Sequence, residues 1–176
     1  SLYARLLGAG RAADARKVSA FSVYGAVAIG LLYSLLIGLF LEPILNLLGA
    51  SSSTIGFAKQ YVWFVVILGD IPIILSTTCA HLLRNAGYAK QAGIGLSGGG
   101  ILNIFLDPLF MFVLLPKGME VVGAALATLL SNIAAMLYLV CVMKKLSKTT
   151  PLSLRLKDAR EIGRGEVRKR ENHAER

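Results

Sequence analysis

Long apolar runs separated by short polar stretches dominate the chain. Four runs are long enough to cross a bilayer, because about 20 apolar residues in a helix span its hydrocarbon core. They lie at about residues 18–42, 57–83, 93–115 and 121–143. The pattern therefore predicts an all-α membrane protein with four transmembrane helices.

The two ends of the chain are polar and flank a four-span bundle at residues 18–146. In residues 1–17, the stretch Leu7-Gly8-Ala9-Gly10 is typical of a helix C-terminus. This segment is therefore predicted to be the end of a preceding helix and a basic cytoplasmic loop. Residues 147–176 are predicted to be a basic, polar cytoplasmic tail, either solvated helix or disordered chain.

Composition and charge support this class of protein. Hydrophobic residues make up 55% of the chain and the mean hydropathy is +0.64, which is too apolar for a water-soluble globule. The formal net charge of +9 lies entirely at the ends, with +3 in residues 1–17 and +6 in residues 144–176. Because the basic residues flank membrane spans, anionic lipid headgroups are the expected partner and nucleic acid is not.

The positions of the basic residues also predict the orientation. Both ends and the connection between the second and third runs are rich in Lys and Arg, whereas the other two connections carry one basic residue each. By the positive-inside rule, the protein is a multi-pass cell-membrane protein with both ends in the cytoplasm.

Enzymatic function is not expected. The chain has no nucleophile–base pair, metal-spaced cluster or phosphate loop, and the run Gly98-Gly99-Gly100 lies within a membrane span. Cys79 and Cys141 lie in apolar runs and are predicted to be buried thiols. No cofactor is expected.

The stretch Asn103-Ile104-Phe105-Leu106-Asp107-Pro108 carries the candidate chemistry. A carboxylate in the middle of a membrane span costs about 2.5–3.5 kcal/mol, so a partner or a wet cavity is expected to accompany it. Asn103 and Asp107 are four residues apart and share one helix face, which Gly95 and Gly99 continue.

Pro108 adds a further acceptor, because it has no N–H to bond the carbonyl of Ile104. The carboxylate of Asp107, the amide oxygen of Asn103 and this free carbonyl together could form a Na⁺ site. The same position could instead bind a proton. The alternative is that Asp107 only hydrogen-bonds to a neighbouring helix and fixes the packing. The residues alone leave both interpretations open.

A second acid, Asp70, lies in the stretch Gly69-Asp70-Ile71-Pro72, which interrupts the second run. Pro72 permits a kink at this point. Asp70 is a candidate for a second acidic site or for substrate binding. The alternative is that it caps the broken helix or reaches towards the interface.

Four patterns, in order and on alternating sides of the membrane, support a family resemblance. They are Arg-Leu-Leu-Gly-Ala-Gly at residues 5–10, Leu-Arg-Asn-Ala-Gly at residues 83–87, Asn-x-x-x-Asp-Pro at residues 103–108 and Gly-Ala-Ala-Leu-Ala-Thr at residues 123–128. With them, the chain resembles part of the N-terminal lobe of a multidrug and toxic compound extrusion (MATE) transporter.

The resemblance implies a fold of two six-helix lobes around a central cleft, with the four spans as the third to sixth helices of the first lobe. It implies export of organic cations, including drugs, in exchange for Na⁺ or H⁺. It assigns Asp107, Asn103 and Thr128 to the cation site. Pro108, Gly99, Gly95 and Pro72 are then hinge or packing positions, and Tyr33, Phe64 and Asp70 are candidates to line the cleft.

The chain also departs from the family pattern. The family's first helix and second lobe have no counterpart here, and the sequence becomes charged at Arg164, as expected of a truncation or a frameshift. The alternatives are a related flippase for lipid-linked oligosaccharides, which the neutral membrane core disfavours, and a non-transporting membrane remnant. A second lobe could come from a partner chain.

Overall fold

A computed structural model of the chain describes residues 1–162. These residues are helical throughout apart from short connections, and the predicted all-α fold is confirmed. The elements are α1 (Leu2–Gly8), α2 (Ala12–Leu39), α3 (Leu41–Leu47), α4 (Ile55–Val62), η1 (Trp63–Leu68), α5 (Asp70–Asn85), α6 (Ala89–Pro108), η2 (Leu109–Leu114) and α7 (Glu120–Leu146). A short helix follows from residue 156.

Three helices are long and apolar enough to cross a membrane, and a bent pair of helices supplies a fourth candidate span. The three are α2, α6 with η2, and α7. The bent pair is α4–η1 with α5, which meet at an angle of 41°. Compared with the sequence prediction, the first span begins earlier, at Ala12, and ends before Glu42, which lies in α3.

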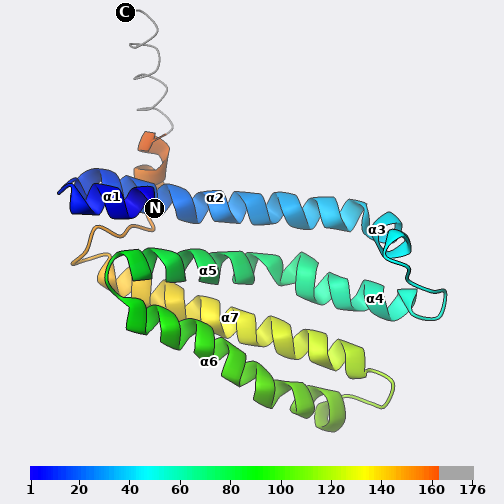
Figure 1. Cartoon of the computed structure of the whole chain (residues 1–176). Coiled ribbons are helices and arrows are strands. Elements are labelled where there is room, and N and C mark those ends of the chain that lie inside the picture. Colours follow the sequence, from blue (N-terminus) through cyan, green and yellow to red (C-terminus); the bar gives the residue numbers. More distant parts are fainter. Residues whose placement is uncertain (163–176) are drawn as a thin grey trace, which may run out of the picture.

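The spans lie side by side, with α5 between α2 and α7, and α6 packed against both α5 and α7 (Figure 1). The N-terminus, the turn between α5 and α6, and the described end of the chain all lie at one end of this bundle (Figure 1). The α3–α4 and α6–α7 connections lie at the other end. An even number of crossings therefore returns the chain to the side where it began.

Glycines in the left-handed region end helices where the sequence predicted. Gly10 has φ 71° after α1 and Gly87 has φ 91° after α5. A side chain at either position would strain the backbone, so glycine allows the chain to turn directly into the next helix.

The bend in the second span lies at Gly69, one residue before Asp70. The preceding segment, η1, is a π-helix, and the carbonyl of Val65 fills the space that a Cβ on Gly69 would need. Pro72 lies in the first turn of α5, where a helix N–H has no partner to lose. Glycine and proline together thus allow the interruption that the sequence predicted.

Small residues bring α6 and α7 into close contact. A Cβ on Gly95 would lie 2.5 Å from Cδ2 of Leu139, and one on Gly99 would lie 2.8 Å from Cβ of Ala135. In a membrane, where lipid is as apolar as a side chain, this close packing is a main source of helix association. Gly95 and Gly99 therefore act in this structure as packing positions.

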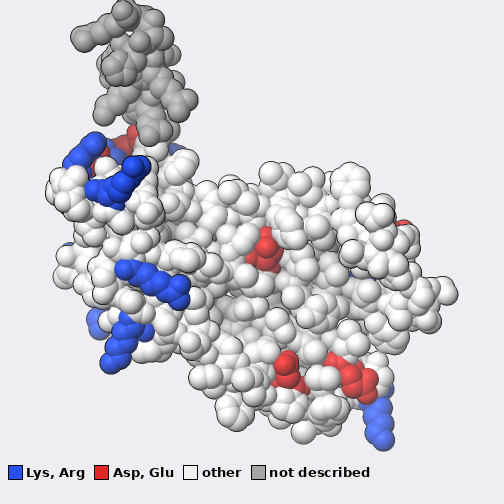
Figure 2. Space-filling view, viewed as in Figure 1, with Lys and Arg blue, Asp and Glu red and all other residues white. Residues whose placement is uncertain are grey.

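Charged side chains are absent from most of the surface of the spans on the face shown in Figure 2. Lys and Arg gather at the end of the bundle that carries α1 and the α5–α6 turn (Figure 2). This is the distribution that the positive-inside rule requires of a cytoplasmic end.

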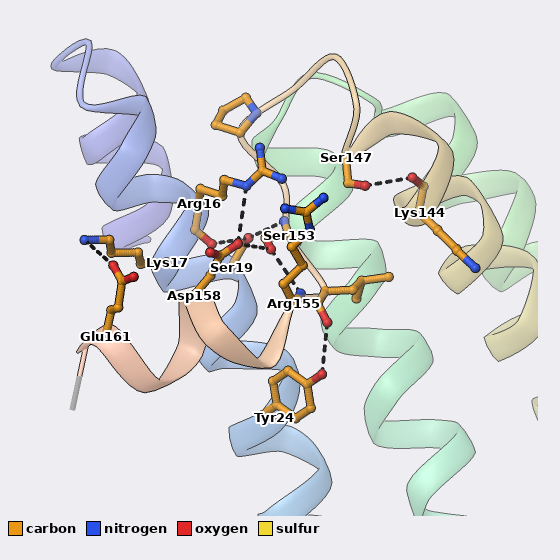
Figure 3. A network of polar contacts seen from close by, with 12 residues as sticks. Arg16, Lys17, Ser19, Tyr24, Lys144, Ser147, Ser153, Arg155, Asp158 and Glu161 are labelled. Carbon is orange, nitrogen blue, oxygen red and sulfur yellow. Dashed lines mark hydrogen bonds and ion pairs between the residues drawn. The ribbon is translucent and has the colours of Figure 1, made fainter. Parts of the chain in front are cut away.

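The segment after α7 folds back onto α2, and we call residues 151–161 the C-terminal clasp (Figure 3). Leu152 and Ser153 in the clasp are 0% and 1% exposed. The backbone N–H of Ser153 donates to Oγ of Ser19 at 2.8 Å, and this hydrogen bond is buried. The hydroxyl of Tyr24 donates to the carbonyl oxygen of Leu154 at 2.9 Å.

Two ion pairs accompany the clasp (Figure 3). Nε of Arg16 lies 3.3 Å from Oδ2 of Asp158, and Nζ of Lys17 lies 2.8 Å from Oε2 of Glu161. Such partly exposed pairs contribute about 0–1 kcal/mol each. The buried Ser153–Ser19 hydrogen bond is therefore expected to matter more to the clasp than these pairs.

Two expectations from the sequence were wrong, one about the start of the tail and one about Cys141. The start of the tail was expected to be solvated, but Leu152, Ser153 and Ala159 are buried because α2 presents a hydroxyl and apolar surface to them. Cys141 is exposed, because it lies on a face of α7 that no described helix covers, whereas Cys79 is buried as predicted. Residues 163–176, which include Arg164, lie outside the described residues.

Replacing Gly99 by Ala is expected to destabilise the chain by about 1–3 kcal/mol, because the new methyl overpacks the contact with Ala135. Gly100→Ala on the same helix is the control, since a Cβ there has no neighbour within 4 Å. The free energy of unfolding in detergent can be followed by the fluorescence of the single tryptophan, Trp63. Equal stability of the two variants would show that α6 does not pack on α7 through Gly99.

Replacing Ser19 by Ala is expected to release the clasp, because it leaves the buried N–H of Ser153 without an acceptor, at a cost of about 1–3 kcal/mol. Trypsin should then cleave after Arg155 and Lys157 faster than in the unmodified chain. Ser22→Ala is the control, because that hydroxyl bonds only to its own helix at Val18. Cleavage at the same rate in all three proteins would mean that the Ser19 contact does not hold the clasp.

Candidate functional site

Asn103 and Asp107 meet on one face of α6, as their spacing predicted. Nδ2 of Asn103 donates to Oδ2 of Asp107 at 2.8 Å. Oγ of Ser131 on α7 donates to Oδ1 of Asn103 at 3.0 Å. A chain of hydrogen bonds therefore links α7 to the acid through the amide, and all three side chains are at least half-buried.

The other oxygen of the acid, Oδ1 of Asp107, is buried and accepts no hydrogen bond from any described residue. Buried polar atoms are almost always paired, because an unpaired one costs about 1–3 kcal/mol. Oδ1 of Asp107 is therefore an unusual atom, a buried acid oxygen that has no partner among the described residues.

The backbone around Asp107 is irregular. Pro108 ends α6 and the π-helix η2 begins at the next residue. On the α7 side, Gly123 leaves room for this wider segment, since a Cβ there would lie 2.9 Å from the carbonyl oxygen of Phe110. Short π-helices of this kind are often found at functional sites.

The sequence predicted that the amide oxygen of Asn103 would lie beside the acid. Instead, the amide nitrogen faces Asp107 and the oxygen faces Ser131. The Ser131 hydroxyl has a second acceptor, the carbonyl oxygen of Thr128 at 2.9 Å. A hydroxyl has one proton to donate, so Ser131 can donate to Thr128 and accept from a rotated Asn103 amide. Either orientation of Asn103 can therefore be satisfied.

Thr128 lies one turn before Ser131 on α7 and is half-buried. It joins the hydrogen-bond chain through its backbone carbonyl. Its hydroxyl makes no hydrogen bond to another residue within the part of the chain described. Ser131 was not predicted as a site residue, and its hydrogen bond to Asn103 across the α6–α7 contact places it beside the acid.

Asp70 belongs to a different interface. It is 9% exposed and faces α2, where a Cβ on Gly30 would lie 3.2 Å from its Oδ2. Of the other candidate cleft residues, Tyr33 is exposed on α2 and Phe64 is half-buried in η1. The two intramembrane acids thus lie at separate helix–helix contacts, yet each adjoins a π-helix.

The described residues do not form a metal centre of the kind that His, Cys, Asp and Glu side chains build together. Residues 1–162 contain no group of three or more His, Cys, Asp or Glu side chains that could hold a metal ion together. A cation at Asp107 would depend on one carboxylate with amide, hydroxyl and carbonyl oxygens, which suits Na⁺ better than a transition metal.

Comparison with known proteins identifies the family. The family model described as MatE matches residues 1–109. The chain belongs to the MatE family. MATE proteins are transporters and not enzymes, so the predicted family and class of protein are confirmed, and the chain is a multi-pass membrane protein.

Curated relatives carry export names. Multidrug export protein MepA of Staphylococcus aureus (strain bovine RF122 / ET3-1) is 34% identical over 152 residues, which cover 86% of this chain and 33% of that protein. Multidrug export protein MepA of Staphylococcus saprophyticus is 34% identical over 150 residues, which cover 85% of this chain and 32% of that protein. The chain therefore spans about a third of the length of these relatives.

A solved structure has the same arrangement of helices. It is the inward-facing conformation of a multidrug resistance MATE family transporter of the MOP superfamily, with a TM-score of 0.80 and 28% sequence identity. The match covers 89% of this chain and 34% of that one. The described bundle is therefore a MATE-type arrangement.

Replacing Ser131 by Ala is expected to lower the stability of the purified chain by about 1–3 kcal/mol, since the amide oxygen of Asn103 loses its donor. Ser97→Ala, at an exposed position on α6, is the control. In a double-mutant cycle with Asn103→Leu, the two losses should not add, because both variants break the same bond. Additive losses would place Ser131 outside the Asn103 network.

Proposed function

We propose that this chain is part of a cation-coupled antiporter that exports organic cations or drugs, with Asp107 as the residue that exchanges the coupling ion, Na⁺ or H⁺. The single observation that carries the proposal is the buried, unpaired Oδ1 of Asp107 beside an amide that can turn. The export names of the MepA relatives support the direction of transport and the class of substrate.

The coupling step follows from the hydrogen bonds of Asn103. The amide N–H of Asn103 donates to Oδ2 of Asp107, which stabilises the anionic form of the acid. When Na⁺ binds, its positive charge repels the N–H, and the amide turns its oxygen towards the ion. Ser131 then accepts from the amide and donates to Thr128, so no buried group loses its partner.

A proton would act at the same atom by a simpler route. Protonation at Oδ1 removes the charge and leaves the hydrogen bond from Asn103 to Oδ2 intact. In either case the acid alternates between a charged and a compensated form. The energy is available, because one charge crossing a potential of 100 mV gains about 2.3 kcal/mol.

The surroundings of Asp107 would let this local change reach the rest of the span. The α6–η2 junction lies next to the acid, and Pro108 withholds one backbone donor there. A segment with fewer fixed hydrogen bonds can adjust its bend at lower cost than a regular α-helix. Ion binding could thereby bias the alternation of access that transporters of this kind perform.

The remaining parts of the proposal concern the whole protein. We place both ends of the chain in the cytoplasm, on the distribution of Lys and Arg. A second lobe would complete the cleft, because the chain covers about a third of its relatives. Substrate cations would be bound between the lobes, where aromatic faces and acids can hold them.

Asp107→Asn in a full-length transporter that contains this sequence is expected to lower gradient-driven efflux of ethidium by about tenfold or more, because it removes the charge that the coupling ion compensates. Asp14→Asn is the control, since Asp14 pairs with Arg11 at the surface. Efflux from proteoliposomes under a Na⁺ gradient or a pH gradient, at equal protein levels, gives the measurement and identifies the ion.

Unchanged efflux in the Asp107→Asn protein would overturn the proposal. The chain alone in the same proteoliposomes tests the alternative of a non-transporting membrane remnant. Efflux by the chain alone would show that it transports without a second lobe. Its absence, together with active full-length protein, would show that the second lobe is required.

A further inference from the structure

Asp70 and Ser34 bury two unpaired oxygens next to each other between α5 and α2. Asp70 is 9% and Ser34 is 8% exposed. Oδ2 of Asp70 and Oγ of Ser34 are both buried and make no hydrogen bond of ordinary geometry to a described residue, although the hydroxyl lies beside the carboxylate. Gly30, one turn before Ser34, provides the space that the carboxylate occupies on α2.

A single proton would satisfy both atoms. A protonated carboxyl becomes a donor as well as an acceptor, and Ser34 can accept from it. A metal cation would need about six oxygen ligands, whereas this position offers a carboxylate and one hydroxyl. An organic cation would need a cavity, and Asp70 is too enclosed to face one.

The neighbours of Asp70 supply no charge to balance it. Among the described residues of α2, α6, α7 and η1, Ser34 is the one polar side chain that acts on Asp70, and no charged group does so. The next titratable residue on α2, Tyr33, is exposed on another face of the helix. Asp70 is the first residue of α5, and no described charged side chain lies beside it to balance an ionised carboxylate.

Two adjacent clefts lie along α2 and α5 near this position, and neither Asp70 nor Ser34 is part of their lining. One, of about 250 Å³, opens at the end of the bundle near α1 and is lined by His81 among others. The other, of about 420 Å³, continues along the helices to Ile74. Both are lined by Ser22 and Thr78, and Ile74 contacts Gly30 beside the acid. Water in these clefts could deliver a proton close to Asp70.

We propose that Asp70 and Ser34 form a proton-binding site at the α2–α5 interface, separate from the Asp107 site. The Asp70 carboxylate takes a proton from water in the clefts, and the new O–H donates to Oγ of Ser34. Loss of the proton breaks this link and leaves the anion at the N-terminus of α5, directly after the bend at Gly69. Protonation thus ties α5 to α2 at the point where the second span bends.

The inference does not rest on ion exchange at Asp107, because the two acids face different helices. Failure of the efflux experiment would leave it standing, and its own failure would leave the Asp107 proposal untouched.

Infrared difference spectroscopy of the purified chain tests the site. The unmodified chain is expected to show a carboxylic-acid C=O stretching band at neutral pH that disappears at alkaline pH. Asp107→Asn should leave a band of this kind in place, and adding Asp70→Asn to that variant should abolish it. Ser34→Ala should keep the band but move it to higher frequency, because the O–H loses its acceptor.

Labelling with dicyclohexylcarbodiimide, which reacts with protonated carboxyls in apolar surroundings, gives a second readout. Peptide mass spectrometry of the labelled chain should place the adduct on Asp70 at neutral pH and show its loss at alkaline pH. Glu42 is the control for an ionised acid, since its pairing with Lys59 lowers its pKa. If Asp70 carries neither the band nor the adduct at neutral pH, the proposed proton site is wrong.

Discussion

The free energy of an unpaired carboxylate oxygen inside a membrane span is the constraint on which this structure depends. Oδ1 of Asp107 and Oδ2 of Asp70 are both buried and receive no hydrogen bond from residues 1–162. Charged groups at the centre of a bilayer are costly, and helix-bundle proteins keep them where they pair or perform work. Each acid lies at a contact with a neighbouring helix: Ser131 of α7 bonds Asn103, which donates to Asp107, and Gly30 of α2 adjoins Asp70.

Close helix packing and irregular backbone occur side by side in this bundle. Gly95 and Gly99 hold α6 against α7 on the same stripe that carries Asn103 and Asp107. Directly after this stripe the helix widens into η2, whereas η1 comes before Asp70 and ends at Leu68. Each acid thus has a close helix contact on one side and an adjustable backbone segment on the other. With this arrangement, a change in the charge of the acid would change the bend of the helix. Local ion binding can affect a whole helix in this way.

Local sequence rules were sufficient for the features that depend on neighbouring residues. The spacing of Asn103 and Asp107 predicted their contact, and Gly69 with Pro72 predicted the interruption of the second span. Contacts between distant residues were beyond such rules. The Ser19–Ser153 hydrogen bond joins residues 134 positions apart, and the pairing of Ser131 with Asn103 depends on how α7 lies on α6. The exposure of Cys141 likewise depends on which helices cover α7, and apolar composition does not encode it.

Ion-dependent stability of the purified chain tests the account most directly. A ligand that binds the folded chain raises its stability by RT ln(1 + [L]/Kd), so an ion that binds at Asp107 must raise the melting temperature. We predict that the melting temperature of the unmodified chain rises with Na⁺ at constant ionic strength, or with proton concentration if H⁺ is the ligand. The Asp107→Asn chain should lose the Na⁺ dependence or, if H⁺ is the ligand, the part of the proton dependence that does not come from Asp70. Equal dependence in both chains, or no dependence on either ion in the unmodified chain, would contradict the claim that the unpaired oxygen of Asp107 binds the coupling ion.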